Sequence, residues 1–294
     1  MTGNAVVRAM MRGVIDYAGL FPPAAASMDA AVRDYGAQLR GPYSWMLGRF
    51  VVPVARLEEL AASFAEHAGA APPRDPWPVS VLARASDAAA LAAFNARYGA
   101  RLRIEMVEAP PVAPGDVNGL ASLAASYGVY AEVGLVSDPA DIVKELARRG
   151  IRPKVRTGGV KQDAIPSPGS VARFIAACHA AGTPYKATAG LHHAWRAEYA
   201  LTYEPAAPCA VMFGFMNALL ADAAAADGAT VAEIERVLAS GAQAFRIAHE
   251  SITLPSGRAV DVSLAARARA GGLQSFGSCS FGEPVADLHA RGLL

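Results

Sequence analysis

Short apolar runs alternate with longer segments of helical periodicity along most of the chain. The apolar runs predict β-strands at residues 12–21, 45–53, 77–84, 102–110, 129–135, 151–159, 184–191 and 273–281. Between them, apolar residues recur with a helical period at 27–39, 55–68, 87–99, 115–128, 139–150 and 167–182. Several of these helical segments begin at Ser or Asp and end at Gly, as capped helices do.

This alternation predicts an α/β fold built from parallel βα units. Eight such units close into a TIM (β/α)8 barrel, and the sequence predicts eight strands. A doubly wound open sheet is the alternative arrangement of the same units. We expect the barrel, with residues 1–294 forming a single domain.

The connection between the seventh and eighth predicted strands is unusually long. Residues 194–272 contain an apolar helical stretch at 208–226, a second helix at 230–240 and a β-hairpin at 244–262. The hairpin is predicted to turn at Pro255-Ser256-Gly257. We expect an elaborated strand 7 to strand 8 connection on the C-terminal face or the flank of the barrel, serving as a lid or an oligomer contact.

Composition and charge exclude several classes of protein. Hydrophobic residues make up 53% and charged residues 18%, which supports a large core and argues against disorder. A net charge of +1 predicts no nucleic-acid or membrane partner, and no apolar run reaches the roughly 18 residues of a membrane span. The N-terminus has no signal-peptide pattern, and the three cysteines are odd in number. We therefore expect a cytoplasmic protein with free thiols. We also expect a homo-oligomer, for which the long connection could supply the contact.

Candidate chemistry lies at the ends of the predicted strands. In a TIM barrel the working residues sit where the strands end, on the C-terminal face. Read strand by strand, these ends offer Asp16, Tyr17, Arg49, Glu105, Glu108, Glu132, Lys154, Arg156, Lys186, Thr188, His192, His193, Ser278, Cys279 and Ser280.

Two lysines occupy similar places near the ends of neighbouring predicted strands. The chain contains only four lysines, and Lys154 and Lys186 each precede Thr and Gly by a few residues. If both amines face into the barrel, two adjacent cations lower each other's pKa. A lysine with a lowered pKa attacks carbonyl carbons and forms a Schiff base. The alternative is that both are ordinary lysines paired with Glu105 or Glu132.

Several short motifs, in the same order along the chain, resemble the deoxyribose-phosphate aldolase family of class I, TIM-barrel aldolases. The resemblance spans most of the chain outside the long connection, and it rests on the motifs collectively because each is short. The motifs are VIDYAGLFPPA at 14–24, GRFVVPVARLEEL at 48–60, RIEMVEA at 103–109, KVRTGG at 154–159, KATAGL at 186–191 and FGSCS at 276–280.

The resemblance implies catalytic roles for three residues and requires no cofactor. Lys154 would form the carbinolamine and Schiff base with a small carbonyl substrate, and Lys186 would keep the Lys154 amine neutral. Glu105, where the family has an aspartate, would shuttle protons through water.

Departures from the family pattern predict a different substrate from deoxyribose 5-phosphate. Arg156 follows Lys154 where the family has small hydroxyl residues, and it could bind a carboxylate or phosphate. His192 and His193 replace a segment that helps to hold phosphate. The substrate-binding set is therefore predicted to be Asp16, Arg49, Glu132, Arg156, Thr188, Gly190, His192, His193, Gly277 and Ser278.

The sequence also admits other functions. His192 and His193, with Glu105, Glu132 or Asp16, would suit a divalent metal in a metal-assisted lyase or hydrolase, although polar loop histidines are the alternative. A barrel without catalysis that binds a ligand is a third possibility.

Three further features also admit two interpretations. Arg49 could bind a substrate carboxylate or pair with Glu105. Cys279 is a candidate nucleophile or a buried small side chain. The apolar stretch at 213–220 predicts buried packing or a subunit interface rather than a cofactor site.

Overall fold

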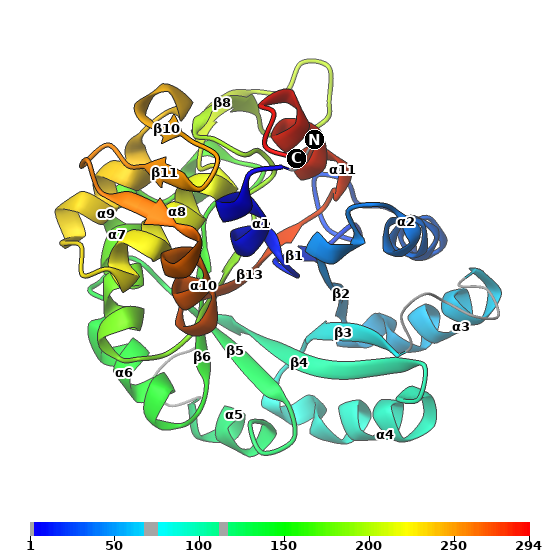
Figure 1. The fold of residues 1–294 in the computed structure, drawn as a ribbon. Coiled ribbons are helices and arrows are strands. Elements are labelled where there is room, and N and C mark those ends of the chain that lie inside the picture. The colour runs from blue at the N-terminus through cyan, green and yellow to red at the C-terminus, as the bar shows by residue number, and fades with distance from the viewer. Residues whose placement is uncertain (1–2, 68–75, 112–116) are drawn as a thin grey trace.

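The computed structural model describes residues 3–67, 76–111 and 117–294 and contains a closed barrel of eight parallel strands (Figure 1). The order around the ring is β1-β13-β7-β6-β5-β4-β3-β2. The barrel strands are β1 (Ile15–Tyr17), β2 (Leu47–Pro53), β3 (Trp77–Leu82), β4 (Leu102–Pro111), β5 (Gly128–Val133), β6 (Arg152–Arg156), β7 (Tyr185–Thr188) and β13 (Leu273–Ser278). All eight predicted strands are confirmed, and the ring is closed as a TIM-type α/β barrel requires.

Helices surround the ring and cover the outer faces of its strands (Figure 1). They are α1 (Ala5–Met11), α2 (Met28–Arg40), α3 (Leu57–His67), α4 (Ala88–Tyr98), α5 (Val117–Leu123), α6 (Ala140–Arg148), α7 (Pro168–Ala180), α8 (Phe215–Ala226), α9 (Val231–Ala239), α10 (Val262–Gly271) and α11 (Gly282–Ala290). Several begin as the sequence predicts. The Ser27 and Ser167 side chains accept hydrogen bonds from first-turn amides of α2 and α7.

The long connection departs from its predicted secondary structure at one end. The helix expected from residue 208 begins only at Phe215, and an antiparallel hairpin precedes it, formed by β8 (Ala197–Ala200) and β9 (Cys209–Met212). Burial alternates along β9, which is the period of a strand with one covered face. The prediction of a helix over 208–214 was therefore wrong. The apolar residues of this segment continue without a break into those of the helix, so the sequence pattern does not mark the boundary.

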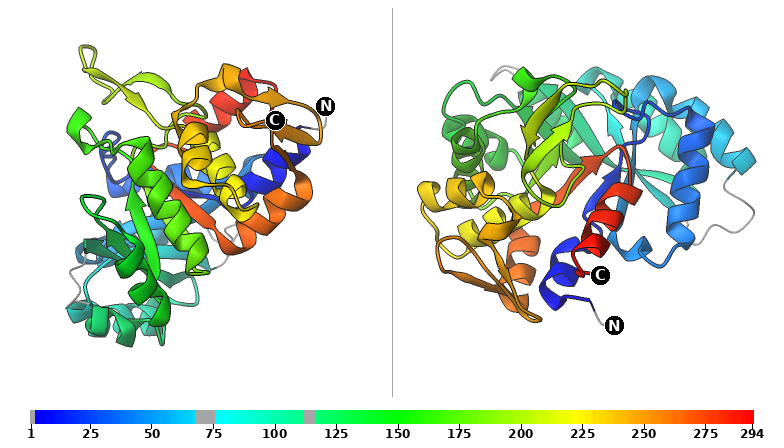
Figure 2. Two further views of the ribbon diagram at one scale, coloured as in Figure 1. Left: turned by 90° about the vertical axis from the view of Figure 1, so that its left-hand side faces the viewer. Right: turned by 90° about the horizontal axis from the view of Figure 1, so that it is seen from above.

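The rest of the connection lies on the flank of the barrel. Helix α9 packs against α7 and α8, and α10 packs against α8 and α1. A three-stranded sheet of β10 (Arg246–Ile247), β11 (Ser251–Thr253) and β12 (Ala259–Asp261) includes the predicted turn at Pro255-Ser256-Gly257. The β8–β9 hairpin instead projects from the body of the molecule (Figure 2).

The apolar stretch at 213–220 is used in core packing within the chain. Phe213, Phe215 and Met216 are buried, and the Phe215 ring stacks on Phe276 of β13. Among the residues that the structure describes, no helix combines the length and the apolar character that crossing a bilayer requires.

Candidate active site

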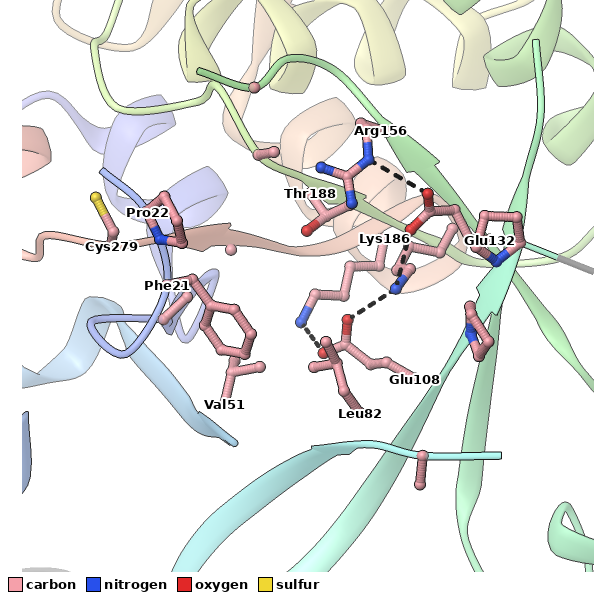
Figure 3. Close-up of a pocket in the computed structure, with 18 of the residues that line it drawn as sticks. Phe21, Pro22, Val51, Leu82, Glu108, Glu132, Arg156, Lys186, Thr188 and Cys279 are labelled. Carbon is pink, nitrogen blue, oxygen red and sulfur yellow. Dashed lines mark hydrogen bonds and ion pairs between the residues drawn. The ribbon is translucent and has the colours of Figure 1, made fainter. Parts of the chain in front are cut away.

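A cavity of about 750 Å³ opens at the C-terminal ends of the barrel strands. This is the face on which TIM barrels carry their active sites. Figure 3 shows charged side chains on one side of the cavity and Phe21 with Val51 on the other. The cavity is lined by Ala18, Phe21, Pro22, Val51, Val54, Leu82, Ala83, Arg84, Asp87, Glu108, Pro110, Pro111, Glu132, Lys154, Arg156, Gly159, Val160, Lys186, Thr188, Ala189, His192, Gly277 and Cys279.

Strand register brings the two predicted lysines together at the floor of this cavity. Lys154 of β6 is the direct partner of Lys186 on β7, and Glu132 of β5 is the partner of Lys154. Residues in register on neighbouring strands of a sheet lie on the same face. Both lysines and Glu132 therefore point into the barrel, where all three are buried.

Lys186 is held tightly between two carboxylates. Its Nζ lies 2.5 Å from Asp16 Oδ2 and 2.6 Å from Glu108 Oε1, and the residue is only 1% exposed. Burial alone would lower the pKa of the amine, but the charges of Asp16 and Glu108 outweigh it and hold the pKa above its ordinary value. The expectation that the lysines lower each other's pKa is thus wrong for Lys186, because two carboxylates contact its amine directly.

Glu108 links the two amines. Its carboxylate contacts Lys186, accepts a hydrogen bond from Ser80 Oγ at 2.7 Å and lies 3.4 Å from Lys154 Nζ. Burial would raise the pKa of this acid, but Lys186 and Lys154 together hold it at about 2. Glu108 is therefore a carboxylate at neutral pH.

Lys154 is held more loosely than Lys186. Its amine lies 3.4 Å from Glu108 Oε2 and 3.3 Å from Glu132 Oε2, at the long end of the ion-pair range. Its side chain lines the cavity, so the amine lies at the floor of a space large enough for a ligand.

Glu105 is not beside the lysines, which corrects its predicted position. It lies three residues nearer the amino end of β4 than Glu108, about 10 Å along the strand. Its half-exposed carboxylate accepts from Arg49 Nε at 3.1 Å. Arg49 therefore pairs with Glu105, as the second interpretation of Arg49 predicted, and does not line the cavity.

The signal for Glu108 was present in the sequence, because it lies closer to the C-terminal end of its strand. Alternation alone could not select it. The pairing of β3 with β4 shifts register between Val79 and Ser80, and this shift changes which residues of β4 face inward.

Arg156 is more accessible than the charged side chains at the floor of the cavity. The Arg156 side chain is half exposed, and its Nε lies 3.3 Å from Glu132 Oε1 (Figure 3). Thr188 and Gly277 also line the cavity. These three members of the predicted substrate-binding set therefore line the cavity, and their binding role stays a prediction.

Five predicted substrate-binding residues do not line the cavity, namely Asp16, Arg49, Gly190, His193 and Ser278. Asp16 lies beneath it, where it binds Lys186, Ser275 Oγ and the Arg49 amide. Gly190 has a φ of +78°, and an added Cβ would lie 2.8 Å from Gly158 Cα. Ser278 donates its hydroxyl hydrogen to the Ser280 carbonyl.

The two histidines face different neighbours. His193 stacks on Tyr199 and lies 3.2 Å from Asp287 Oδ2. His192 lines the cavity, with its Nδ1 3.6 Å from Cys279 Sγ. Burial, with a smaller contribution from His193, lowers the pKa of His192 to about 4. In the described part of the chain, no group of three or more His, Cys, Asp or Glu side chains is placed to hold a metal ion.

The β8–β9 hairpin reaches the same side of the barrel. Tyr203, between its strands, places its hydroxyl 3.5 Å from Cys279 Sγ and 3.0 Å from Glu283 Oε2. Because Cys279 directly follows β13, the hairpin stands at the C-terminal face, and the remaining connection lies on the flank. Burial raises the pKa of the Cys279 thiol, so the group is a thiol at neutral pH.

Comparisons with known proteins do not identify a family. No family model matches the chain, and no curated protein matches it. Among solved structures, a lysine/ornithine decarboxylase from Vibrio vulnificus in complex with cadaverine aligns with a TM-score of 0.37 and 10% identity. The alignment covers 63% of this chain and 48% of that enzyme, so the chain spans about half of the enzyme's length. A similarity of this strength carries no argument about the chemistry of the present chain.

Proposed function

We propose that this protein is an aldolase-like lyase that forms a Schiff base between Lys154 and a small carbonyl substrate. The observation that carries the proposal is the Lys154 amine at the floor of a large cavity, in contact with two carboxylates. The motif resemblance to deoxyribose-phosphate aldolases supports the same chemistry, independently of the fold.

The contacts favour Lys154 over Lys186 as the nucleophile. Lys186 has two shorter ion pairs and a raised pKa, so it stays a cation throughout the neutral range. A cation is not a nucleophile, and of the two amines that of Lys154 has the longer contacts with its carboxylate neighbours. Lys186 then serves as a fixed positive charge beside the reacting amine.

Glu108 is positioned to take the proton that Lys154 must lose. Its pKa of about 2 depends on two neighbouring cations, and neutralising Lys154 removes one of them. The neutral amine adds to the carbonyl carbon to give a carbinolamine. Loss of water from the carbinolamine, with a proton supplied by Glu108, gives a protonated imine. The imine carries the same charge as the original ammonium group, so the surrounding carboxylates stabilise both.

The protonated imine then accepts the electron pair of a breaking carbon–carbon bond, or releases a proton to give the enamine that forms one. Water adds to the final imine and releases the product and the free amine. Arg156 stands half exposed at the mouth, where its guanidinium suits a carboxylate or phosphate on the substrate.

Borohydride trapping tests this proposal directly. The protein is incubated with small aldehydes and ketones in the presence of borohydride, which reduces an imine to a stable secondary amine. Mass spectrometry of peptides should then place the added mass on Lys154. In Lys154→Met the adduct should fall at least about a hundredfold, as expected when a nucleophile is removed. Lys144→Met, changed on helix α6, is the matched control and should label like the unaltered protein.

Lys186→Met separates the two lysines. We expect its adduct to remain on Lys154 and to form more slowly, because the fixed charge is gone. An adduct that maps to Lys186 in the unaltered protein would reverse the two roles. No adduct with any carbonyl compound would favour a ligand-binding barrel whose buried ion pairs only stabilise the ring.

A further inference from the structure

The cavity is divided into a charged half and an apolar half, which correspond to two arcs of the barrel. From β4 to β7, its walls carry Glu108, Glu132, Lys154, Arg156, Lys186 and Thr188. From β1 to β3 and the loops that follow them, the lining side chains up to residue 83 are Ala18, Phe21, Pro22, Val51, Val54, Leu82 and Ala83. None of the side chains in this second group can donate or accept a hydrogen bond.

Each arc is continuous in space. Strands β1, β2 and β3 are neighbours in the ring, and strands β4 to β7 are neighbours as well. In Figure 3, Phe21 and Val51 lie across the cavity from Glu132 and Arg156. Polar side chains flank the apolar arc at both ends: Arg84 and Asp87 lie at the rim after β3, and Cys279 with His192 lies beside the β1 end. A ligand bound to Lys154 therefore faces mainly hydrocarbon side chains on the far side of the cavity.

The apolar half is unsuited to a polyhydroxylated substrate. A hydroxyl group buried there would lose its hydrogen bonds to water without gaining a partner, which is unfavourable. A hydrocarbon group would gain by leaving water. The cavity volume of about 750 Å³ lies in the range of pockets that bind ligands of drug-like size. A two- or three-carbon substrate would fill only a small part of this volume.

We propose that the substrate carries a hydrocarbon group of several carbons, aliphatic or aromatic, on the carbonyl carbon that Lys154 attacks. This inference rests on the proposed Schiff-base function and specifies its substrate class. The carbonyl lies at the charged floor, any anionic group lies toward Arg156, and the hydrocarbon group packs over Phe21, Val54 and Leu82.

A homologous series of aldehydes tests the substrate class. Borohydride trapping on Lys154 is measured with propanal, butanal, hexanal and octanal, and with glyceraldehyde as the polar counterpart of propanal. We expect the concentration for half-maximal trapping to fall about fourfold per added methylene, which corresponds to about 0.8 kcal/mol for each buried CH₂. Glyceraldehyde should be trapped more weakly than propanal.

A change in the apolar wall should alter this chain-length dependence. Phe21 lies in the loop after β1, packed partly against the core, so its truncation is compatible with folding. Phe21→Ala should lower the ratio of octanal to propanal trapping about tenfold, and Phe21→Leu should retain most of the ratio. Val136→Ala, at a fully exposed position, is the control and should retain the whole ratio.

The two proposals fail in different ways. Equal trapping along the aldehyde series, or stronger trapping of glyceraldehyde, would overturn the hydrocarbon-bearing substrate and leave the Schiff base intact. Calorimetric binding of propanol, hexanol and octanol, which form no imine, examines the apolar half by itself. Alcohol affinity that rises with chain length without any aldehyde adduct would support the apolar half and overturn the Schiff base. Alcohol affinity that does not rise would overturn the apolar half.

Discussion

At the scale of single residues, six charged side chains alternate in sign along the floor and wall of the cavity. The ion pairs run from Asp16 through Lys186, Glu108, Lys154 and Glu132 to Arg156. Three carboxylates therefore balance three cations, and all six except Arg156 are buried. Removing one charge leaves its neighbours uncompensated, and buried charges without a partner are strongly destabilising.

Glu108 should contribute a pH-dependent part of the stability. Its pKa falls from 4.5 in the unfolded chain to about 2 in the folded one, which corresponds to about 3 kcal/mol. Because the folded pKa is the lower one, this stabilisation is present above about pH 4.5 and is lost as the pH falls toward 2. Glu108→Gln should therefore be less stable than the unaltered protein near neutral pH, and the difference should shrink on acidification.

Urea unfolding between about pH 6 and pH 3 measures this change in the free energy of unfolding, because most of the stabilisation by Glu108 should be lost over that range. Glu198→Gln, at an exposed position of β8, is the control and should show little difference at any pH. A stability difference for Glu108→Gln that stays constant over this range would contradict the lowered pKa.

At the scale of elements, one buried carboxylate ties together two helices and the last barrel strand. Asp222 of α8 contacts His179 Nε2 of α7 at 2.7 Å and accepts from the Leu273 amide, the first of β13, at 3.0 Å. It is 1% exposed. An added Cβ at Gly272 would collide with this carboxylate, so the chain approaches it closely. Asp222 therefore fixes the end of the long connection where β13 enters the barrel.

Asp222→Asn should destabilise the protein by about 3 kcal/mol, because an amide offers one acceptor where the carboxylate offers two. Urea unfolding at neutral pH measures the loss, and Lys154 trapping should be retained in the folded variant because Asp222 lies outside the cavity. Asp163→Asn, at an exposed position, should change stability by less than about 0.5 kcal/mol. Equal effects of the two substitutions would show that Asp222 has no special structural role.

At the scale of the whole molecule, closure of the ring brings the two ends of the chain together. Strand β1 pairs with β13, and the Asn4 amide donates to the Leu293 carbonyl at 3.2 Å. The two termini lie side by side in Figures 1 and 2. The turn between β8 and β9, at residues 202–208, is mostly exposed. Assembly into a homo-oligomer remains a prediction, which sedimentation of the full chain would test.

A circular permutant follows from this arrangement. Joining the termini with a short Gly/Ser linker and opening the chain between Pro205 and Ala206 should preserve the barrel, because neither change cuts a barrel strand. We expect a native far-ultraviolet circular dichroism spectrum and a urea midpoint close to that of the unaltered protein. Opening the chain within β6, between Lys154 and Val155, should abolish folding. If the permutant opened between Pro205 and Ala206 also failed to fold, this result would contradict the proposed tolerance of the turn.

Much of the fold could be predicted from the sequence, because its signals are local. Apolar runs and helical periods located all eight barrel strands and the helices between them. The turn at Pro255-Ser256-Gly257 depended on residues adjacent in the chain, and so did the caps at Ser27 and Ser167. The β8–β9 hairpin was missed because its apolar residues run directly into those of α8.

The site was predicted less completely, because its geometry depends on register between strands. The sequence by itself determined that Lys154 and Lys186 lie near the ends of neighbouring strands. Only the tertiary structure decided that Glu108 rather than Glu105 joins them, that Lys186 is fixed as a cation, and that β1 to β3 supply an apolar wall. The physical reason is that the side-chain period of a strand is local, whereas its stagger, its bulges and the charges that it meets are set by the closed ring.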